Sequence, residues 1–277
     1  MKLRRILYML FLYGVTLMLL VFALFPILWV LSTSFTPDHL IFVQPPQWIP
    51  ETITFHHYNE VIRNPEILRY FMNSFITAIT STVVGLIIGI LGAYGFSRYK
   101  FPGRKTLLIS VMLTRLLPRV ALIVPFLVTL RNLGLYNTRA GLVLVFLVIT
   151  MPLSLWLLKG FFDSIPYEIE EAAVVDGCSP LGILLRIDLP MILPAIASVG
   201  MFIFITAWNE FLFSLTMTQG RALRAISVGL AFFIDDQFVQ WGALMAASVL
   251  MSIPAIVIFT LFSRFLIKGL SEGAVKG

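Results

Sequence analysis

Six apolar runs in this chain are each long enough to cross a lipid bilayer as a helix. They lie at residues 6–31, 70–97, 106–130, 140–158, 191–216 and 243–263. A spanning helix needs about 17–25 mainly apolar residues. The hydrocarbon core offers no water to bind backbone N–H and C=O groups, and a helix satisfies those groups within its own segment. The runs therefore predict an all-α membrane protein with six transmembrane helices.

The composition agrees with a membrane protein and argues against nucleic-acid binding. Hydrophobic residues make up 59% of the chain and charged residues only 12%, whereas soluble domains carry roughly 25% charged residues. The net charge of +6 could suit nucleic acid, but the basic residues are scattered at the ends of the apolar runs. That placement is typical of a membrane-topology signal. We expect membrane lipid, and no nucleic acid, as a partner.

The distribution of Lys and Arg predicts the orientation of the chain. If the N-terminus is inside, 12 of the 20 basic residues fall in inner segments and six in outer ones. Basic residues favour the cytoplasmic side, so both termini and the connection at 160–190 are expected in the cytoplasm. The apolar run at 6–31 is about twice as long as the core of a signal peptide and lacks a small-x-small cleavage site, so residues 1–32 are predicted to be a retained span. Residues 33–69 then form an extracytoplasmic loop with a short helix near 58–63.

Metal and nucleotide sites have no sequence support. The single cysteine, Cys178, excludes an internal disulfide, and the three histidines (His39, His56 and His57) lack metal-ligand spacing. The dipeptide Gly-Lys does not occur, so the phosphate-binding loop pattern is absent. We expect no metal or cofactor in this chain. If ATP drives its activity, another chain must hydrolyse the ATP.

The connection at 160–190 differs from the apolar runs around it, because it holds six of the chain's 14 acidic residues. Ser164 is predicted to cap a short helix whose first turns carry three glutamates. Gly177 would end that helix in a left-handed conformation. Ser179 and Pro180 would start a second helix, and Pro190 would end or kink it. Two short helices between spans predict a docking device for another protein.

The same connection carries a recognisable pattern. Glu171-Ala172-Ala173, three residues, Gly177, nine residues and Ile187-Asp188-Leu189-Pro190 match the EAA loop of bacterial and archaeal ABC importer permeases. Trp208-Asn209-Glu210-Phe211 resembles the family's Trp-Asn-x-Phe element, and residues 98–104 resemble its second inner loop. The tail at 268–277 is similar to that of carbohydrate-uptake permeases of the maltose, trehalose and glycerol-phosphate group. The resemblance covers nearly the whole chain.

This resemblance implies a type I ABC importer permease. Such a subunit pairs with a second homologous permease, two ATPase subunits that bind ATP and Mg, and an extracytoplasmic substrate-binding protein. The shared core would span residues 70–263, with the first helix as an added element and 264–277 as a cytoplasmic tail. The residues implied to couple the chain to an ATPase are Glu171, Ala172, Ala173, Asp176 and Gly177. Glu171 would be a polar contact, the two alanines a close-packing surface, and Gly177 the turn.

Two arginines interrupt the third run at helical i, i+4 spacing. Arg115 and Arg119 would lie near mid-bilayer in a helix bent near Pro118 and Pro125. An intramembrane arginine is costly and faces water or the protein interior. Two interpretations stay open. The arginines line the translocation cavity, or they pair internally, for instance with Glu210.

Other polar and small residues inside the runs have structural explanations as well. Asn209 is placed with Glu210 in the substrate pathway, although such a residue also bonds neighbouring helices. Gly85, Gly89 and Gly92 predict close helix contact rather than a ligand site.

The leading functional prediction is a transport subunit without catalysis of its own, importing a disaccharide or small glycoside by alternating access. One alternative is an anionic solute such as glycerol phosphate. Another is an integral membrane enzyme that uses Glu170, Glu171 and Asp176 as paired carboxylates, but Glu171 and Asp176 do not share a helix face. An autonomous secondary transporter would show an internal repeat, and none is evident.

Overall fold

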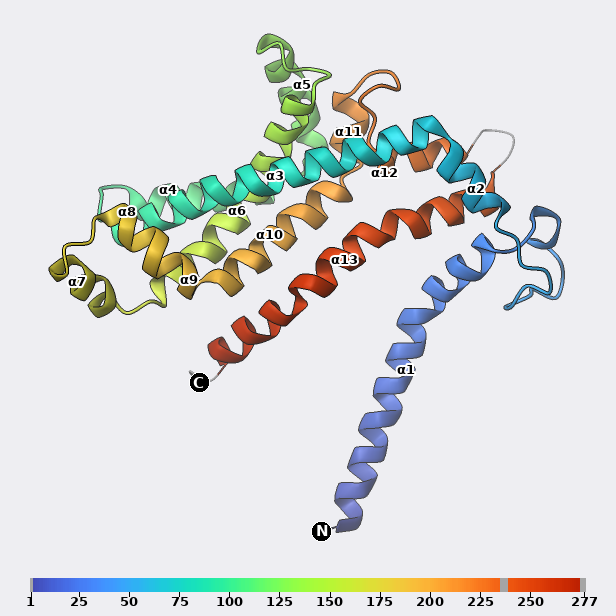
Figure 1. The fold of residues 1–277 in the computed structure, drawn as a ribbon, viewed down its shortest axis with the longest axis horizontal. Helices are drawn as coiled ribbons and strands as arrows, with labels where there is room; N and C mark the ends of the chain where they lie inside the picture. The colour runs from blue at the N-terminus through green and yellow to red at the C-terminus, as the bar shows by residue number, and fades with distance from the viewer. Residues whose placement is uncertain (1, 235–238, 275–277) are drawn as a thin grey trace. The chain divides into compact units, whose positions relative to one another are not determined.

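A computed structural model of the protein describes residues 2–234 and 239–274. The regular structure of these residues is helical, apart from one isolated antiparallel bridge between Ile234 and Val239 (Figure 1). The chain forms two compact units, one of residues 1–68 and 230–253 and the other of residues 69–229 and 254–277. Each unit is described by itself.

The first unit holds the N-terminal helix and the loop that follows it. Its elements are α1 (Lys2–Ser34), η1 (Asp38–Leu40), α2 (His56–Arg63), η5 (Ala231–Phe233) and the beginning of α13 (Trp241–Ala274). The predicted helix near 58–63 is α2. The Trp48 ring packs edge-on against Trp29 and Phe25, with centroids 5.0 and 4.9 Å away. The loop thus folds back onto the end of α1, and aromatic clusters of this kind suit a membrane interface.

The second unit holds the end of α13, from Pro254, and the remaining helices. They are α3 (Pro65–Arg98), α4 (Arg104–Leu113), η2 (Thr114–Leu116), η3 (Arg119–Leu122), α5 (Ile123–Asn132), α6 (Arg139–Asp163), α7 (Tyr167–Val175), α8 (Pro180–Ile183), the π-helical turn η4 (Leu184–Asp188), α9 (Leu189–Met191), α10 (Leu193–Trp208), α11 (Leu212–Met217) and α12 (Ile226–Leu230). The N-terminal turn of α3 and the last residue of α12 belong to the first unit.

Helices α3, α6 and α10 form the core of the second unit, where small residues allow close approach. A Cβ atom on Gly85 of α3 would lie 3.1 Å from the Ile203 side chain of α10 and 3.2 Å from Leu147 of α6. A Cβ on Gly92 would lie 2.8 Å from Leu155 of α6. The prediction that these glycines serve helix contact is confirmed, since membrane helices pack closely where side chains are small.

Four of the six predicted spans are continuous helices, within α1, α3, α6 and α13. The other two belong to helix pairs bent by 104° (Arg104–Leu116 with Arg119–Asn132) and 80° (Pro180–Met191 with Leu193–Trp208). The described residues thus hold four spans, or six if each bent pair crosses the membrane once. The prediction of six spans is confirmed within that range, but two of them are not single helices.

The third predicted span, 106–130, is broken rather than gently bent. Leu117 is extended with ψ 130°, and Pro118 follows with φ −63° and ψ 127°. A proline disfavours the helical conformation of the residue before it and has no N–H to donate. Arg115 and Arg119 therefore lie on opposite sides of a break, and the expected i, i+4 helical spacing is wrong. The mid-bilayer depth counted along one helix does not apply either.

The fifth predicted span, 191–216, is wrong at its end, because α10 stops at Trp208 and α11 starts only at Leu212.

The predicted boundary at residue 264 does not coincide with a helix end, because α13 continues to Ala274. Residues 275–277 of the predicted tail, with Lys276, lie outside the described residues.

Candidate functional site

The loop at 160–190 forms two short helices, as predicted. The first, α7, does not use Ser164 as its cap, and this detail of the prediction is wrong. Ser164 ends α6 instead, and its hydroxyl donates to the Phe161 carbonyl at 2.7 Å. Pro166 occupies the N-cap position without a side-chain bond, and Glu168 and Glu170 lie in the first turn. Gly177 follows the helix with φ +82°, the left-handed conformation that the pattern predicts.

Helix α7 has one face of solvent-exposed, mainly apolar residues. Val174 and Val175 are 59% and 87% exposed, and Glu171 and Ala172 beside them are also exposed. We call these four residues the outer face of α7. Ala173 is buried at 6% exposure, so the structure separates the two alanines. Ala172 can meet a partner, whereas Ala173 packs inside the chain.

The second helix begins where Ser179 and Pro180 predict. The Ser179 hydroxyl accepts a bond from the Gly182 N–H at 3.2 Å, which caps α8. The chain then passes through η4, whose Leu184 packs in the same apolar cluster as Phe162 and Ile165. The bend of 80° follows Met191, close to the predicted position at Pro190. Asp176, between the two helices, is exposed.

Asp188 lies at the end of η4, before the predicted fifth span, and is fully buried. Neither of its carboxylate oxygens has a hydrogen-bond partner among the described residues. Burial, followed by the negative charge of Glu170, raises the pKa of Asp188 from 3.8 to about 6, and the positive charge of Arg98 acts in the opposite direction. A carboxyl group in such surroundings is easier to keep protonated than an ordinary one.

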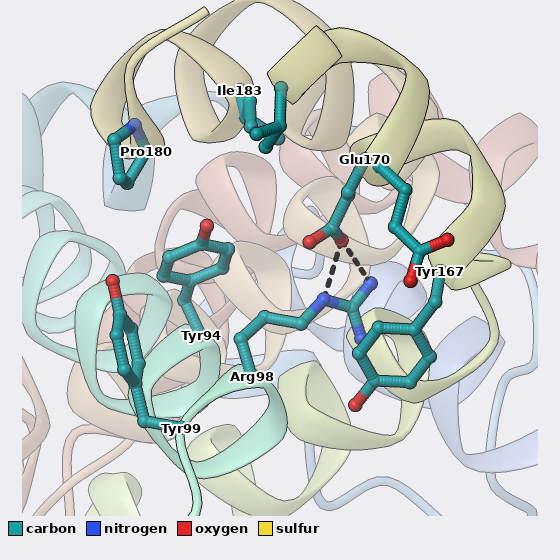
Figure 2. A pocket seen from close by; sticks show the side chains of 9 residues that line it. Tyr94, Arg98, Tyr99, Tyr167, Glu170, Pro180 and Ile183 are labelled. Atoms are coloured by element: carbon teal, nitrogen blue, oxygen red, sulfur yellow. Dashed lines mark hydrogen bonds and ion pairs between the residues drawn. The ribbon is translucent and has the colours of Figure 1, made fainter.

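Arg98, at the end of α3, meets Glu170 of α7 beside a small cavity (Figure 2). Nε and Nη2 of Arg98 each lie 2.5 Å from Oε1 of Glu170. The cavity has a volume of about 350 Å³ and is lined by Tyr94, Arg98, Tyr99, Tyr167, Glu170, Glu171, Val174, Pro180 and Ile183. The sequence indicated Arg98 as a basic residue of an inner segment and as the first residue of a loop that resembles the family's second inner loop, but not as a contact of α7. The position of Arg98 at the start of a loop that resembles the family's second inner loop was the one feature of the sequence that could have indicated this further contact.

The candidate substrate-pathway residues do not form one cluster. Arg115 and Arg119 are exposed on this chain, and the ion pairs found among the described residues involve neither. Glu210 is 5% exposed and accepts the backbone N–H groups of Phe213 and Ser214, each at 3.0 Å. Glu210, which precedes the N-cap residue Phe211, thus satisfies two N–H groups in the first turn of α11.

Asn209 is exposed and donates its side-chain N–H to the Ile205 carbonyl at 3.0 Å. Arg119 is near enough to act electrostatically on Glu210, although no ion pair within 4.0 Å joins them. Within the described part of the chain, no group of three or more His, Cys, Asp or Glu residues could hold a metal ion.

Comparison with known proteins identifies the family of this chain and several relatives. Residues 83–272 match the family described as "binding-protein-dependent transport system inner membrane component". The chain is 36% identical to the inner membrane ABC transporter permease YcjP of Escherichia coli, with 93% of each chain covered. It is 34% identical to the trehalose/maltose transport permease MalG of Thermococcus litoralis, also with 93% of each covered. Identity to the sulfoquinovosyl glycerol transport permease SmoH of Agrobacterium fabrum is 32%, with 94% of this chain and 91% of the relative covered.

The fold is shared with solved structures of bacterial transporters. A chain in the crystal structure of an ABC transporter that imports the acidic polysaccharide alginate matches with a TM-score of 0.81 at 22% identity, covering 93% of this chain and 96% of that one. A chain of the alginate transporter in complex with its pentasaccharide-bound periplasmic protein matches with a TM-score of 0.72 at 19% identity, covering 94% of each. The chain therefore belongs to the binding-protein-dependent transport inner membrane components, as a multi-pass ABC importer permease of the inner membrane.

Proposed function

We propose that this permease imports a disaccharide or small glycoside, with α7 as the helix through which ATPase closure reaches the spans. A permease of this family is not an enzyme, and ATP is bound by partner ATPase subunits. The transported solute and the coupling residues are our proposals. The relative named for trehalose and maltose is 34% identical over nearly the whole chain, which supports a sugar of this size.

The observation that carries the coupling role is the outer face of α7. Two valines, an alanine and a glutamate stand exposed on a helix that ends at a left-handed glycine. Exposed apolar residues in such a group mark an interaction surface. We infer that this face enters a cleft of an ATPase subunit, with Glu171 as the polar contact. Gly177 and Asp176 then set the direction of the chain after the helix.

The mechanism we propose is alternating access in a complex with a second permease, two ATPases and an extracytoplasmic binding protein. Closure of the ATPases on ATP draws the docked loops together, and the spans then open toward the loaded binding protein. Hydrolysis returns them to the inward-open state. Each partner must bind one state better than the other, because equal affinity for both would shift nothing.

An anionic glycoside is a second candidate for the solute. Arg115 and Arg119 are exposed on this chain with no ion-pair partner among the described residues, and a relative at 32% identity is named for sulfoquinovosyl glycerol. Guanidinium groups bind anions and also donate to sugar hydroxyls. Uptake of labelled maltose, trehalose and a sulfonated glycoside by cells expressing the importer separates the two candidates. Uptake of the sulfonated glycoside alone contradicts the disaccharide.

Gly177 tests the coupling role. In the Gly177→Ala variant a Cβ would meet no atom within 4 Å, so the strain comes only from φ +82° and costs about 1–2 kcal/mol. We expect the ATPase subunits still to co-purify while ATP-driven uptake falls about tenfold. Gly160→Ala is the matched control, because Gly160 is helical and also has open space around it. Equal uptake by both variants would contradict the role of the turn.

A further inference from the structure

Arg98 joins the end of a spanning helix to three points on the segment that carries α7. Its guanidinium binds Glu170 through two nitrogens, each 2.5 Å from Oε1. Nη2 also donates to the Ile165 carbonyl at 3.4 Å, and the Cζ atom lies 4.8 Å from the centre of the Tyr167 ring. Figure 2 shows Glu170 and Tyr167 on either side of the guanidinium. The side chains of Arg98 and Glu170 are 5% and 13% exposed, so solvent screens this pair little.

The same cluster extends to α6. Nη1 of Arg98 donates to the Ser97 hydroxyl at 2.9 Å, and that hydroxyl donates to Oδ1 of Asp163 at 2.6 Å. Asp163 also pairs with Lys159, one turn earlier on α6. The Tyr167 hydroxyl donates to the Ser97 carbonyl at 3.3 Å. These bonds connect the ends of α3 and α6 with the start of α7.

Helix α7 has little other anchorage. Ala173 is its one buried residue, and its C-terminal valines are exposed. An apolar contact of one alanine fixes a helix weakly, since the stabilisation scales with buried apolar area. The Arg98–Glu170 contact, in which two guanidinium nitrogens meet one carboxylate oxygen, is charge-assisted and therefore stronger than a neutral hydrogen bond. The ion pair described between α7 and α3 is thus the one that Arg98 makes, and one neutral bond from the Tyr167 hydroxyl to the Ser97 carbonyl accompanies it.

We propose that Arg98 is a positioning residue for coupling, which makes α7 and the cytoplasmic end of α3 move as one body. This rests on the proposed function of α7 as the ATPase-contacting helix. A displacement of α7 by the ATPase then reaches α3 directly through Glu170 and Tyr167. Without Arg98, the side-chain bond described between α7 and α3 is the single one from the Tyr167 hydroxyl to the Ser97 carbonyl, and the backbone at residues 164–166 and 176–179 makes the remaining connections. Arg98 itself touches no solute and no nucleotide in this scheme.

The experiment measures whether the two helices move together. Spin labels are placed at Glu168→Cys on α7 and Leu91→Cys on α3, in a Cys178→Ser background, in the assembled importer. Glu168 and Leu91 are exposed. Electron–electron distance measurements are made without nucleotide and after trapping with ADP and vanadate. With Arg98 present, we expect one narrow distance distribution that is the same in both conditions.

In the Arg98→Gln and Glu170→Gln variants, we expect the distribution to widen about twofold, because one charge of a buried pair is left uncompensated. The double variant should be no wider than either single one, since both substitutions remove the same interaction. Arg98→Lys, which keeps the charge but loses the two-nitrogen contact, should give an intermediate width. Lys105→Gln is the matched control for a nearby exposed basic residue.

Co-purification of the ATPase subunits separates failure of this inference from failure of the proposed function. If the ATPases bind but the unsubstituted distance changes on trapping, α3 and α7 do not move as one body and the inference is wrong. A distance distribution in the Arg98→Gln variant that is as narrow as in the unsubstituted importer also contradicts the inference. If the unsubstituted importer binds no ATPase, the proposed function of α7 is what fails.

Discussion

Asp188 is the residue whose surroundings differ most from those of an ordinary carboxylate. It is fully buried, without a hydrogen-bond partner among the described residues, and within electrostatic reach of both Glu170 and Arg98. Burial, followed by the negative charge of Glu170, raises the pKa of Asp188 to about 6, so the protonated form is favoured below about that pH in the folded chain.

This environment predicts a dependence of stability on pH. Because the pKa of Asp188 rises from 3.8 to about 6, the folded state holds a proton more tightly than the unfolded state. The contribution of this proton to the free energy of unfolding is fully present below about pH 4 and is lost as the pH rises through about 6. We expect Asp188→Asn to remove this loss and raise the Tm of the purified importer above pH 6 by a few degrees, on the order of what 1 kcal/mol gives.

The measurement is thermal unfolding between pH 4 and 8, followed by tryptophan fluorescence. Glu168→Gln is the control, because Glu168 is an exposed acid on α7. A Tm profile for Asp188→Asn that parallels the unsubstituted one would contradict the assignment.

At the scale of elements, the contacts among α3, α6 and α10 depend on the absence of side chains on one face of α3. A Cβ at Gly85 already meets side chains at 3.1 and 3.2 Å from two different helices. Gly85→Val is therefore expected to destabilise the assembled permease by about 1–3 kcal/mol through overpacking. The matched control is Gly95→Val on the same helix, where a Cβ meets no atom within 4 Å. Equal yields of folded permease from both variants in a detergent-stability assay would argue against this packing.

The break between η2 and η3 changes what the two arginines can do. Since Arg115 and Arg119 do not share a helix face, we expect their substitutions to act separately. Arg119→Gln should lower uptake about tenfold with normal assembly, because its charge is exposed and acts on Glu210. Uptake kinetics and co-purification are measured together, with Lys105→Gln as the control. Unchanged uptake kinetics in the Arg119→Gln variant would contradict a role of Arg119 in the substrate pathway.

For the whole molecule, the orientation in the membrane is a prediction of charge distribution that one native residue can test. Cys178, the single cysteine, lies partly exposed beside Gly177. With 160–190 in the cytoplasm, a membrane-impermeant maleimide should label Cys178 in inside-out vesicles and not in intact spheroplasts. A Cys178→Ser chain carrying Asn132→Cys, at the opposite end of the third predicted span, should show the reverse pattern. Labelling of Cys178 in intact spheroplasts would show that the 160–190 loop lies outside, which contradicts the predicted orientation.

The sequence by itself determined the class of the protein, the number of apolar runs and the position of the 160–190 loop. These follow from local properties, because run length, charge and the αL preference of Gly177 act within a few residues. The EAA pattern likewise identified the family, which the comparisons confirm. Four spans and both loop helices were predicted well because their signals are contiguous.

Only the tertiary structure decided which side chains meet across distant segments. Arg98 and Glu170 are 72 residues apart, and no periodicity along the chain relates them. The break at Pro118 also needed the fold, because a proline can bend a helix slightly or end it, and the surrounding contacts choose between these outcomes. The exposure of Ala172 and the burial of Ala173 also depend on tertiary structure, because burial is decided by the residues that folding brings next to each side chain. The two short helices of the loop were thus predictable, whereas the contact of Glu170 in the loop with Arg98 of α3 was not.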